Sequence, residues 1–229
     1  MVHYEEKERF LARQVEKRQS ELFDLLSDLI RFPTPNPPGS NEVQAQLWVK
    51  NKLENIGLKT DMWDALPNRP NVVGVLKGEG RGPTVILNSH IDVCEDTLMD
   101  AWANNPYNPK IIDGRMIGRG SSDMKSALAS FLFALQLLQE NGVRLQGNVE
   151  VHSVMGEEAG EPGTQSVIKR GYTGDFAIVG ESSKGDSLVP SLGLLTLRIT
   201  IESKETLHLV TRKKTLNAGG KLSGGNCVE

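Results

Sequence analysis

The chain has 229 residues, of which 38% are hydrophobic and 24% are charged, and its formal net charge is −3 at pH 7. This composition is enough to bury a core and excludes wholesale disorder, while the small negative charge excludes a general attraction to nucleic acid or anionic membranes. The two cysteines, Cys94 and Cys227, are too few for a disulfide scaffold and lack the spacing of a zinc ribbon.

The first residues of the chain give no sign of export. Residues 1–18 are charged and helical in pattern, without the apolar core that a signal peptide needs. No run in the sequence approaches the roughly 18–20 apolar residues of a membrane span. We therefore expect a cytoplasmic protein with no membrane or nucleic-acid partner.

Two helices are predicted before the first strand. Apolar residues recur at helical spacing over residues 10–30 and predict one long amphipathic helix, which the proline-rich segment 33–39 ends. Ser40 or Asn41 is expected to cap a second helix, and Gly57 is expected to close it.

Apolar runs later in the chain predict the strands of a sheet. Residues 71–76 and 84–88 are expected to be two strands separated by a glycine-rich turn. Residues 110–118 predict a small hairpin around Asp113-Gly114, a strong turn dipeptide. The remaining predicted elements are a helix that Ser121 or Ser122 caps and Asn141-Gly142 ends, a strand at 148–155, a helix at 164–169, a strand at 176–179 and a strand at 194–201.

Strands that alternate with helices predict an α/β fold, here a three-layer α/β/α sandwich with a mixed, largely parallel sheet. Ligands of such sheets collect at the carboxyl ends of the strands. His90, the pair Glu157-Glu158 and Glu181 each follow a predicted strand, and Asp123 lies at the opening of a predicted helix. The fold class therefore predicts that these side chains gather at one edge of the sheet.

The spacing of His90 and Asp92 suits a metal site. In extended chain, residues two apart point to the same side, and a carboxylate beside a metal-bound imidazole fixes its tautomer and raises its basicity. Taken alone, a His-x-Asp pair is more often an ordinary surface pair than a metal site. Its significance depends on the acids that follow it.

Each later acid also has an ordinary interpretation. Asp123 fits a helix-start acid favoured by the helix dipole, and Glu157-Glu158 fits a solvated acidic loop. Glu181 is equally ordinary by itself. Four histidine or acid sites at four successive element ends, the last two directly after a glycine, together predict a metal centre, and mixed imidazole and carboxylate ligands suit zinc, cobalt or manganese.

These motifs resemble those of the co-catalytic dinuclear zinc metallohydrolases, which include acetylornithine deacetylase, succinyl-diaminopimelate desuccinylase, aminoacylase and related carboxypeptidases. The similarity covers roughly residues 20–205, and the segment Asp123-Met124-Lys125 is its most specific part. The other matching segments are 88–93, Trp102 with 106–109, 113–122, Gly156-Glu157-Glu158 and the proline-rich segment 32–39, which is similar to the family's substrate-side loop.

The resemblance implies a zinc exopeptidase-like fold and a role for each matching residue. His90 and Glu181 would hold the first of two divalent metal ions, most often Zn with Co possible, and Asp123 would bridge both ions. Glu158 would bind the second ion. The resemblance also implies a cis peptide bond after the bridging aspartate.

Two further residues receive catalytic roles from the resemblance. Asp92 would orient His90, and Glu157 would be the general base that acts on a metal-activated water. The sequence departs from the family pattern at Cys94-Glu95, where a hydrophobic residue and proline are usual, and this change is expected to alter only the rim of the site.

The resemblance also predicts the domain organisation. Residues 1–190 would form the N-terminal portion of the catalytic domain, residues 191–207 the start of a truncated lid and dimerisation domain, and residues 208–229 a divergent or disordered tail. His208 lies near the position of a lid histidine that polarises the scissile carbonyl. A late histidine that completes the second metal site in the family has no counterpart, so the resemblance predicts a truncated member of a homodimeric family.

The function predicted first is a zinc-dependent hydrolase, a deacylase or metallopeptidase, that cleaves the amide bond of a small N-acyl amino acid. Within it, an acetylornithine deacetylase-like role in amino-acid biosynthesis ranks first. A dipeptidase or carboxypeptidase, a succinyl-diaminopimelate desuccinylase-like enzyme and a deformylase remain open. Two non-catalytic hypotheses also stay open: an inactive truncated fragment, for which we expect weak or absent turnover, and an unrelated binding module.

Overall fold

The computed structural model describes residues 2–94 and 101–182. Its N-terminal helical region is divided into two helices. Helix α1 spans Val2–Lys17 and helix α2 spans Gln19–Ile30. The prediction of one long helix is wrong at Arg18, where the backbone leaves the helical region at φ −114° and ψ 22°. The Arg18 side chain pairs both with Glu21 of α2 and with Glu140 at the end of α4, so the break falls where the chain docks on another helix.

Helix α3 spans Glu42–Ile56, and Gly57 closes it in the left-handed region at φ 99°, as predicted. Asn41 is the residue at the N-cap position, as predicted, but it makes no side-chain capping hydrogen bond. Asn41 itself has a left-handed φ of 59°, and its side-chain amide instead donates to the carbonyl of Pro33. The amide of Asn41 therefore stabilises the proline-rich segment rather than the helix.

A five-stranded mixed sheet lies at the centre of the described residues, with the strand order β2-β3-β8-β4-β9. Strands β2, β3 and β8 pair antiparallel, whereas β8, β4 and β9 pair parallel. The strands span Lys59–Leu66 (β2), Arg69–Leu76 (β3), Val85–His90 (β4), Val149–Val154 (β8) and Phe176–Val179 (β9). Strand β2 was not predicted, because its partly exposed residues carry no continuous apolar run.

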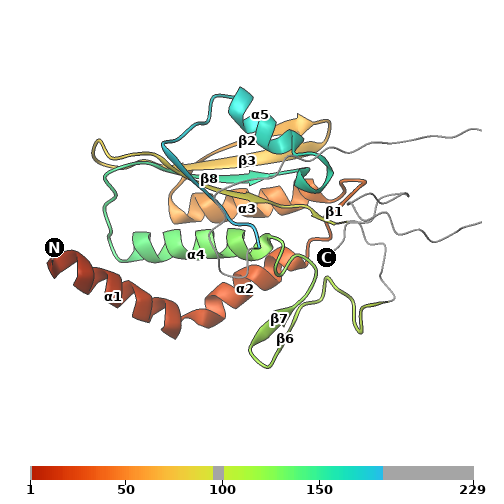
Figure 1. The fold of residues 1–229 in the computed structure, drawn as a ribbon, viewed down its shortest axis with the longest axis horizontal. Helices are drawn as coiled ribbons and strands as arrows, with labels where there is room; N and C mark the ends of the chain where they lie inside the picture. The colour runs from red at the N-terminus through yellow and green to blue at the C-terminus, as the bar shows by residue number, and fades with distance from the viewer. Residues whose placement is uncertain (1, 95–100, 183–229) are drawn as a thin grey trace, which may run out of the picture. The chain divides into compact units, whose positions relative to one another are not determined.

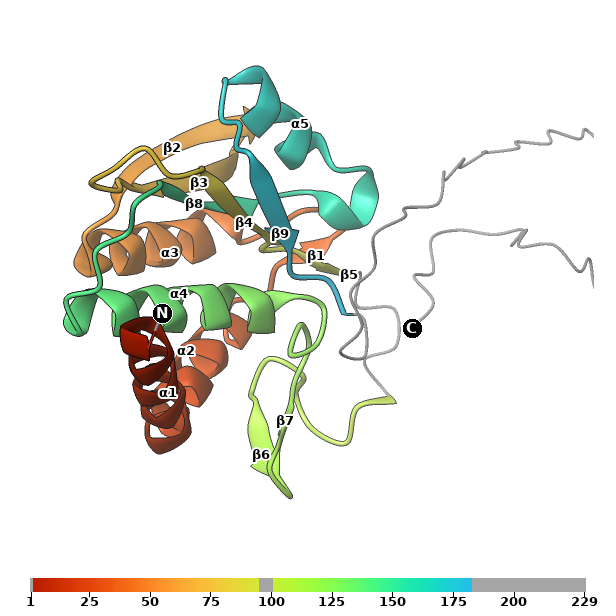
Figure 2. The same ribbon diagram turned by 60° about the vertical axis from the view of Figure 1, so that its left-hand side comes forward.

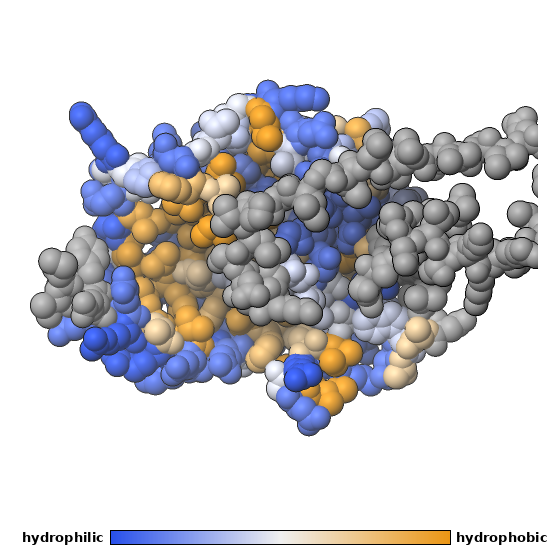
Figure 3. All heavy atoms as spheres, viewed as in Figure 1, coloured by the Kyte–Doolittle hydropathy of each residue, from blue (hydrophilic) through white to orange (hydrophobic). Residues whose placement is uncertain are grey.

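Two small strand pairs lie outside this sheet. Strand β1, Pro35–Asn36, pairs in parallel with β5, Val93–Cys94. Strands β6, Lys110–Ile112, and β7, Arg115–Ile117, form the predicted hairpin. Its turn residues Asp113 and Gly114 have φ values of 49° and 74°, the positive values that a two-residue hairpin turn requires. The hairpin carries exposed isoleucines, visible as orange atoms at the lower edge of Figure 3.

Three further helical segments follow. Helix α4 spans Lys125–Glu140, a 3-10 turn spans Glu157–Ala159, and helix α5 spans Pro162–Lys169. The predicted serine caps of α4 are wrong: the helix begins at Lys125, whose amide donates to the carbonyl of Gly120 at 3.0 Å. That hydrogen bond closes a separate turn before α4, and the turn carries Asp123.

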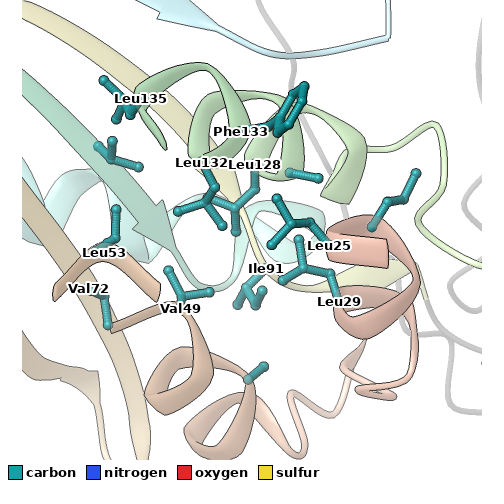
Figure 4. Close-up of a cluster of buried hydrophobic side chains, with 14 of the residues drawn as sticks. Leu25, Leu29, Val49, Leu53, Val72, Ile91, Leu128, Leu132, Phe133 and Leu135 are labelled. Carbon is teal, nitrogen blue, oxygen red and sulfur yellow. The ribbon is translucent and has the colours of Figure 1, made fainter. Parts of the chain in front are cut away.

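The helices cover the sheet on both faces, which confirms the predicted three-layer α/β/α sandwich (Figures 1 and 2). Helix α5 packs over β2, β3 and β8, and the main core lies on the opposite face between the sheet and α2, α3 and α4. Figure 4 shows Leu29, Leu53 and Leu132 in this core, and each of them is fully buried. None of the helices in the described ranges is long and apolar enough to cross a membrane.

Several predictions from the sequence lie outside the described residues. These are the strand at 194–201, the start of a lid at 191–207, the tail at 208–229 and the role of His208.

Candidate metal centre

The candidate site lies where three parallel strands end. His90 is the last residue of β4 and is in register with Val154, the last residue of β8. Glu157 and Glu158 follow β8, and Glu181 follows β9, so all of them lie at the carboxyl edge of the sheet. The strand-end positions predicted for these acids are confirmed, and the parallel pairing explains why they meet.

His90 is the centre of the cluster. Its side chain is 1% exposed, and its Nδ1 atom lies 2.8 Å from the backbone carbonyl oxygen of Asp92. A carbonyl accepts only from a protonated nitrogen, so this contact places a proton on Nδ1 and leaves Nε2 directed at the acids. Nε2 lies 3.1 Å from Asp123 Oδ1, 3.6 Å from Glu181 Oε1 and 3.8 Å from Glu157 Oε2.

The structure brings together every residue that the sequence predicted as a metal ligand. Two groups of three side chains each offer ligand atoms within 4.8 Å of one another, and His90 belongs to both groups. One group is His90 with Glu157 and Glu158; the other is His90 with Asp123 and Glu181. Because Glu157 and Glu158 both lie within reach, the assignment of Glu157 as base and Glu158 as ligand stays a prediction.

Burial and the charge of neighbouring acids raise the pKa values of three glutamates around His90. Burial, opposed by His90 and reinforced by the neighbouring acids, raises the pKa of Glu157 to about 7. Burial also raises the pKa of Glu158 and of Glu181, and the charge of Asp123 adds to both shifts. For His90, burial lowers the pKa, but contact with Asp123 and the other acids outweighs it and raises the pKa to about 9.

This donor set fits divalent cations. Carboxylate oxygens and an imidazole nitrogen are the ligands that zinc, cobalt and manganese accept, and buried acids of like charge need a cation or protons to lie this close. Each of the two groups supplies one nitrogen and two carboxylates within ligand distance of one another. The residues present therefore suit the kind of ion that the sequence predicted.

Asp92 contributes differently from the prediction. Its carboxylate Oδ1 lies 3.6 Å from His90 Nδ1, so its backbone carbonyl, and not its side chain, makes the short contact with the imidazole. The fully buried carboxylate instead accepts hydrogen bonds from the backbone amides of Gly156, Glu157 and Glu158, at 2.9, 3.3 and 3.2 Å. Asp92 thus holds the turn that carries the two glutamates.

Cys94 lies inside the site, so the expectation that it alters only the rim is wrong. Its sulfur donates to Glu158 Oε2 at 2.9 Å. The parallel pairing of β1 and β5 places it there, since Cys94 is in register with Asn36. The sequence signal was available, because Cys94 lies two residues beyond Asp92 and so shares its side of an extended chain.

Two functional neighbours were missed by reasoning from the sequence. Asn36 is 1% exposed, and its Nδ2 donates to Asp92 Oδ2 at 2.7 Å. Lys125 is fully buried, and its Nζ donates to the carbonyls of Leu29 and Phe32 at the end of α2. The proline-rich segment therefore packs beneath the acids. Asp123-Met124 is a cis peptide bond, as the resemblance implied.

A cavity of about 320 Å³ adjoins the cluster. It lies between strands β4 and β9 and helix α5, and His90, Glu157 and Glu181 form its acidic end. The rest of its wall is mostly apolar and includes Val167, Tyr172 and Val179. An apolar recess with a few polar groups at one end is the usual form of a small-molecule site.

Residues 86–211 match the profile of peptidase family M20/M25/M40. The chain is 40% identical over 222 residues to an N-formyl-4-amino-5-aminomethyl-2-methylpyrimidine deformylase of Bacillus subtilis, covering 96% of this chain and 52% of the relative. It is 30% identical to a cysteinylglycine-S-conjugate dipeptidase of Corynebacterium striatum, covering 80% and 43%. The structure of human carnosine dipeptidase 1 superposes with a TM-score of 0.63 at 19% identity, covering 71% and 37%. The chain spans about half the length of the curated relatives it matches.

Proposed function

We propose, from the premise that this chain belongs to peptidase family M20/M25/M40, that it carries the metal centre of an enzyme that hydrolyses a small N-acyl amide. The observation that carries the proposal is that His90 is shared by two groups of possible ligands, one with Glu158 and one with Asp123 and Glu181. Two neighbouring sites that share ligands are the arrangement that two-metal hydrolases use.

The residues divide into proposed metal ligands and a proposed general base. His90 and Glu181 would hold one divalent ion, Glu158 would hold the other, and Asp123 would bridge them, with zinc the ion that this donor set suits best. Bound ions of this kind lower the pKa of water and polarise the amide carbonyl.

Glu157 is the proposed general base. Its side chain is 33% exposed and lies 3.8 Å from His90 Nε2, so it borders both the ligands and the open cavity. A carboxylate in this position takes a proton from the attacking water at Oε2 and returns it to the departing amine. The mostly apolar wall of the cavity would receive the remainder of the substrate and exclude water from it.

The substrate class we propose is a small N-formyl amine attached to an aminopyrimidine. Support comes from the named activity of the two relatives that are 40% identical over 96% of this chain, against 30% or less for the dipeptidase and the desuccinylases. We rank it ahead of N-acetylornithine, which the sequence motifs favoured, because motifs at the metal centre are shared by the whole family and do not select the acyl group. The apolar cavity wall also suits a flat heteroaromatic ring better than a charged amino acid.

The test is metal stoichiometry and formate release by the purified 229-residue chain. We expect two zinc ions per chain and release of formate from N-formyl-4-amino-5-aminomethyl-2-methylpyrimidine in preference to acetate from N-acetylornithine. Glu157→Gln should lower kcat by about 100-fold or more while both ions stay bound, because it removes the base and no ligand.

Glu16→Gln is the matched control, because it makes the same change at an exposed acid on α1 that does not line the cavity. A chain that binds no divalent ion, or that binds ions and hydrolyses none of these amides, would overturn the proposal. Faster release of acetate than of formate would overturn the choice of substrate alone.

A further inference from the structure

We propose that Asn36 is a positioning residue for the Glu157-Glu158 turn, and that it acts through the carboxylate of Asp92. The inference rests on the proposed function only for the roles of the two glutamates. The geometry that supports it is a chain of hydrogen bonds from the proline-rich segment, through one buried carboxylate, to the backbone of the turn.

The first link is the attachment of Asn36 to the end of β4. Its segment is joined to residues 91–94 by three contacts: the β1–β5 pairing, a hydrogen bond from the Val93 amide to the Thr34 carbonyl at 3.0 Å, and one from Thr34 Oγ1 to the Ile91 carbonyl at 2.7 Å. Figures 1 and 2 both place β1 beside the ends of the central strands. These contacts fix the backbone of Asn36 independently of its own side chain.

The second link is the contact between Asn36 and Asp92. Both side chains are almost fully buried, and Asn36 Nδ2 donates to Asp92 Oδ2 at 2.7 Å. A buried carboxylate is costly unless its oxygens receive hydrogen bonds, and bonds to a charged acceptor are among the strong ones. Asn36 supplies such a bond without adding charge, which an acid at this position could not do.

The third link is the hold of Asp92 on the turn. Oδ1 accepts from the amides of Gly156 and Glu157, and Oδ2, the oxygen that Asn36 contacts, accepts from the amide of Glu158. Gly156 adopts a left-handed φ of 81°, which aims these successive amides at one carboxylate. The orientation of the carboxylate therefore sets where the backbone of both glutamates lies.

Two features separate this role from simple stabilisation of a buried acid. Asn36 and the glutamates are more than 100 residues apart in the chain, and the Asp92 carboxylate joins them. The metal-ligand group that depends on the turn contains Glu157 and Glu158, whereas the other contains Asp123 and Glu181. Loss of Asn36 should therefore affect the two groups unequally.

The experiment compares Asn36→Ala with Gln46→Ala in the 229-residue chain. Gln46 is an equally buried amide on α3, and its substitution removes hydrogen bonds to Ser153 that do not involve Asp92. Zinc affinities are measured by competition with a chelator, and folding is checked by circular dichroism. Asn36→Ala should lower the affinity for one of the two zinc ions by about tenfold, which is the low end of what loss of a supporting contact costs. The affinity for the other ion should change by less than about threefold.

A measurement on the unaltered, metal-free chain keeps the proposal testable if Asn36→Ala does not fold. The side-chain amide protons of Asn36 and the backbone amide protons of residues 156–158 should exchange slowly with solvent in nuclear magnetic resonance spectra. Rapid exchange of the Asn36 amide would overturn the proposal, as would an equal loss of affinity for both ions or the same shift in Gln46→Ala. None of these readouts needs turnover. A chain that hydrolyses nothing would therefore overturn the proposed function, whereas the role of Asn36 is tested separately by the zinc affinities and the exchange rates.

Discussion

The two acid pairs around His90 are built differently. Glu157 and Glu158, the turn pair, lie on a turn whose three successive amides are bound to the buried carboxylate of Asp92. Asp123 and Glu181, the outer pair, come from the turn before α4 and from the end of β9, and their side chains are 51% and 42% exposed. One pair is held by the protein, and the other faces solvent.

The difference teaches which part of the site is formed before an ion arrives. A turn held by hydrogen bonds to a buried acid keeps its geometry without a cation, because breaking it would leave a buried charge unpaired. The backbone of the outer pair is not bound to a buried acid, and water screens the mutual repulsion of its exposed carboxylates. We therefore expect the turn pair to be preorganised and the outer pair to be ordered by the ion that it binds.

The largest expected effect comes from the residue that both pairs share. His90→Ala should lower the affinity for the ion that His90 and Glu181 would hold by about 100-fold or more, because loss even of an outer-shell partner costs about 10–100-fold. Metal content after dialysis, measured by mass spectrometry, checks this. Retention of two tight ions by a folded His90→Ala chain would show that the imidazole is not a ligand.

Removing one acid from each pair should have an intermediate effect. Glu158→Ala and Glu181→Ala should each reduce the metal content from two ions to one, because each residue belongs to one group only. Glu181→Ala should also leave the amides of residues 156–158 slow to exchange, since Asp92 and not the outer pair holds them. Loss of that protection in Glu181→Ala would break the distinction between the two pairs.

The smallest expected effect concerns helix α5, which follows the turn. Asp61 on β2 accepts from Arg170, at the end of α5, and from Tyr172. The hydrogen bond from Arg170, with help from Tyr172 and against burial, lowers the pKa of Asp61. Asp61→Asn should cost about 1 kcal/mol in the free energy of unfolding at pH 7, a surface-pair value because the Arg170 side chain is 46% exposed.

The pH dependence of that effect has a definite sign. A lowered folded-state pKa contributes stability that is present above the unfolded value, about 4 for aspartate, and is lost as the pH falls through the folded value. Urea unfolding of the unaltered chain and of Asp61→Asn should therefore differ at pH 7, and the difference should shrink as the pH falls below about 4. Zinc affinity should stay within about twofold, and a larger change would show that α5 also positions the turn pair.

Much of the fold follows from local chemistry that the sequence displays. The hairpin around Asp113-Gly114 and the end of α3 at Gly57 were predictable, because positive φ values select these residue types whatever surrounds them. The break at Arg18 was not predictable, since the helical pattern continues through it and the break depends on Glu140 far along the chain. Strand β2 was missed for a similar reason: its partner β3 completes it, and its own residues carry no strong signal.

The sequence by itself indicated which residues gather at the candidate metal centre, because side chains at the carboxyl ends of parallel strands meet at one edge of the sheet. It identified His90, Asp123, Glu158 and Glu181, and the structure brings all four together. Only the tertiary structure decided what supports them. The contact of Asn36 with Asp92 arises when β1 pairs with β5, and no local pattern encodes an encounter between side chains that lie 56 residues apart.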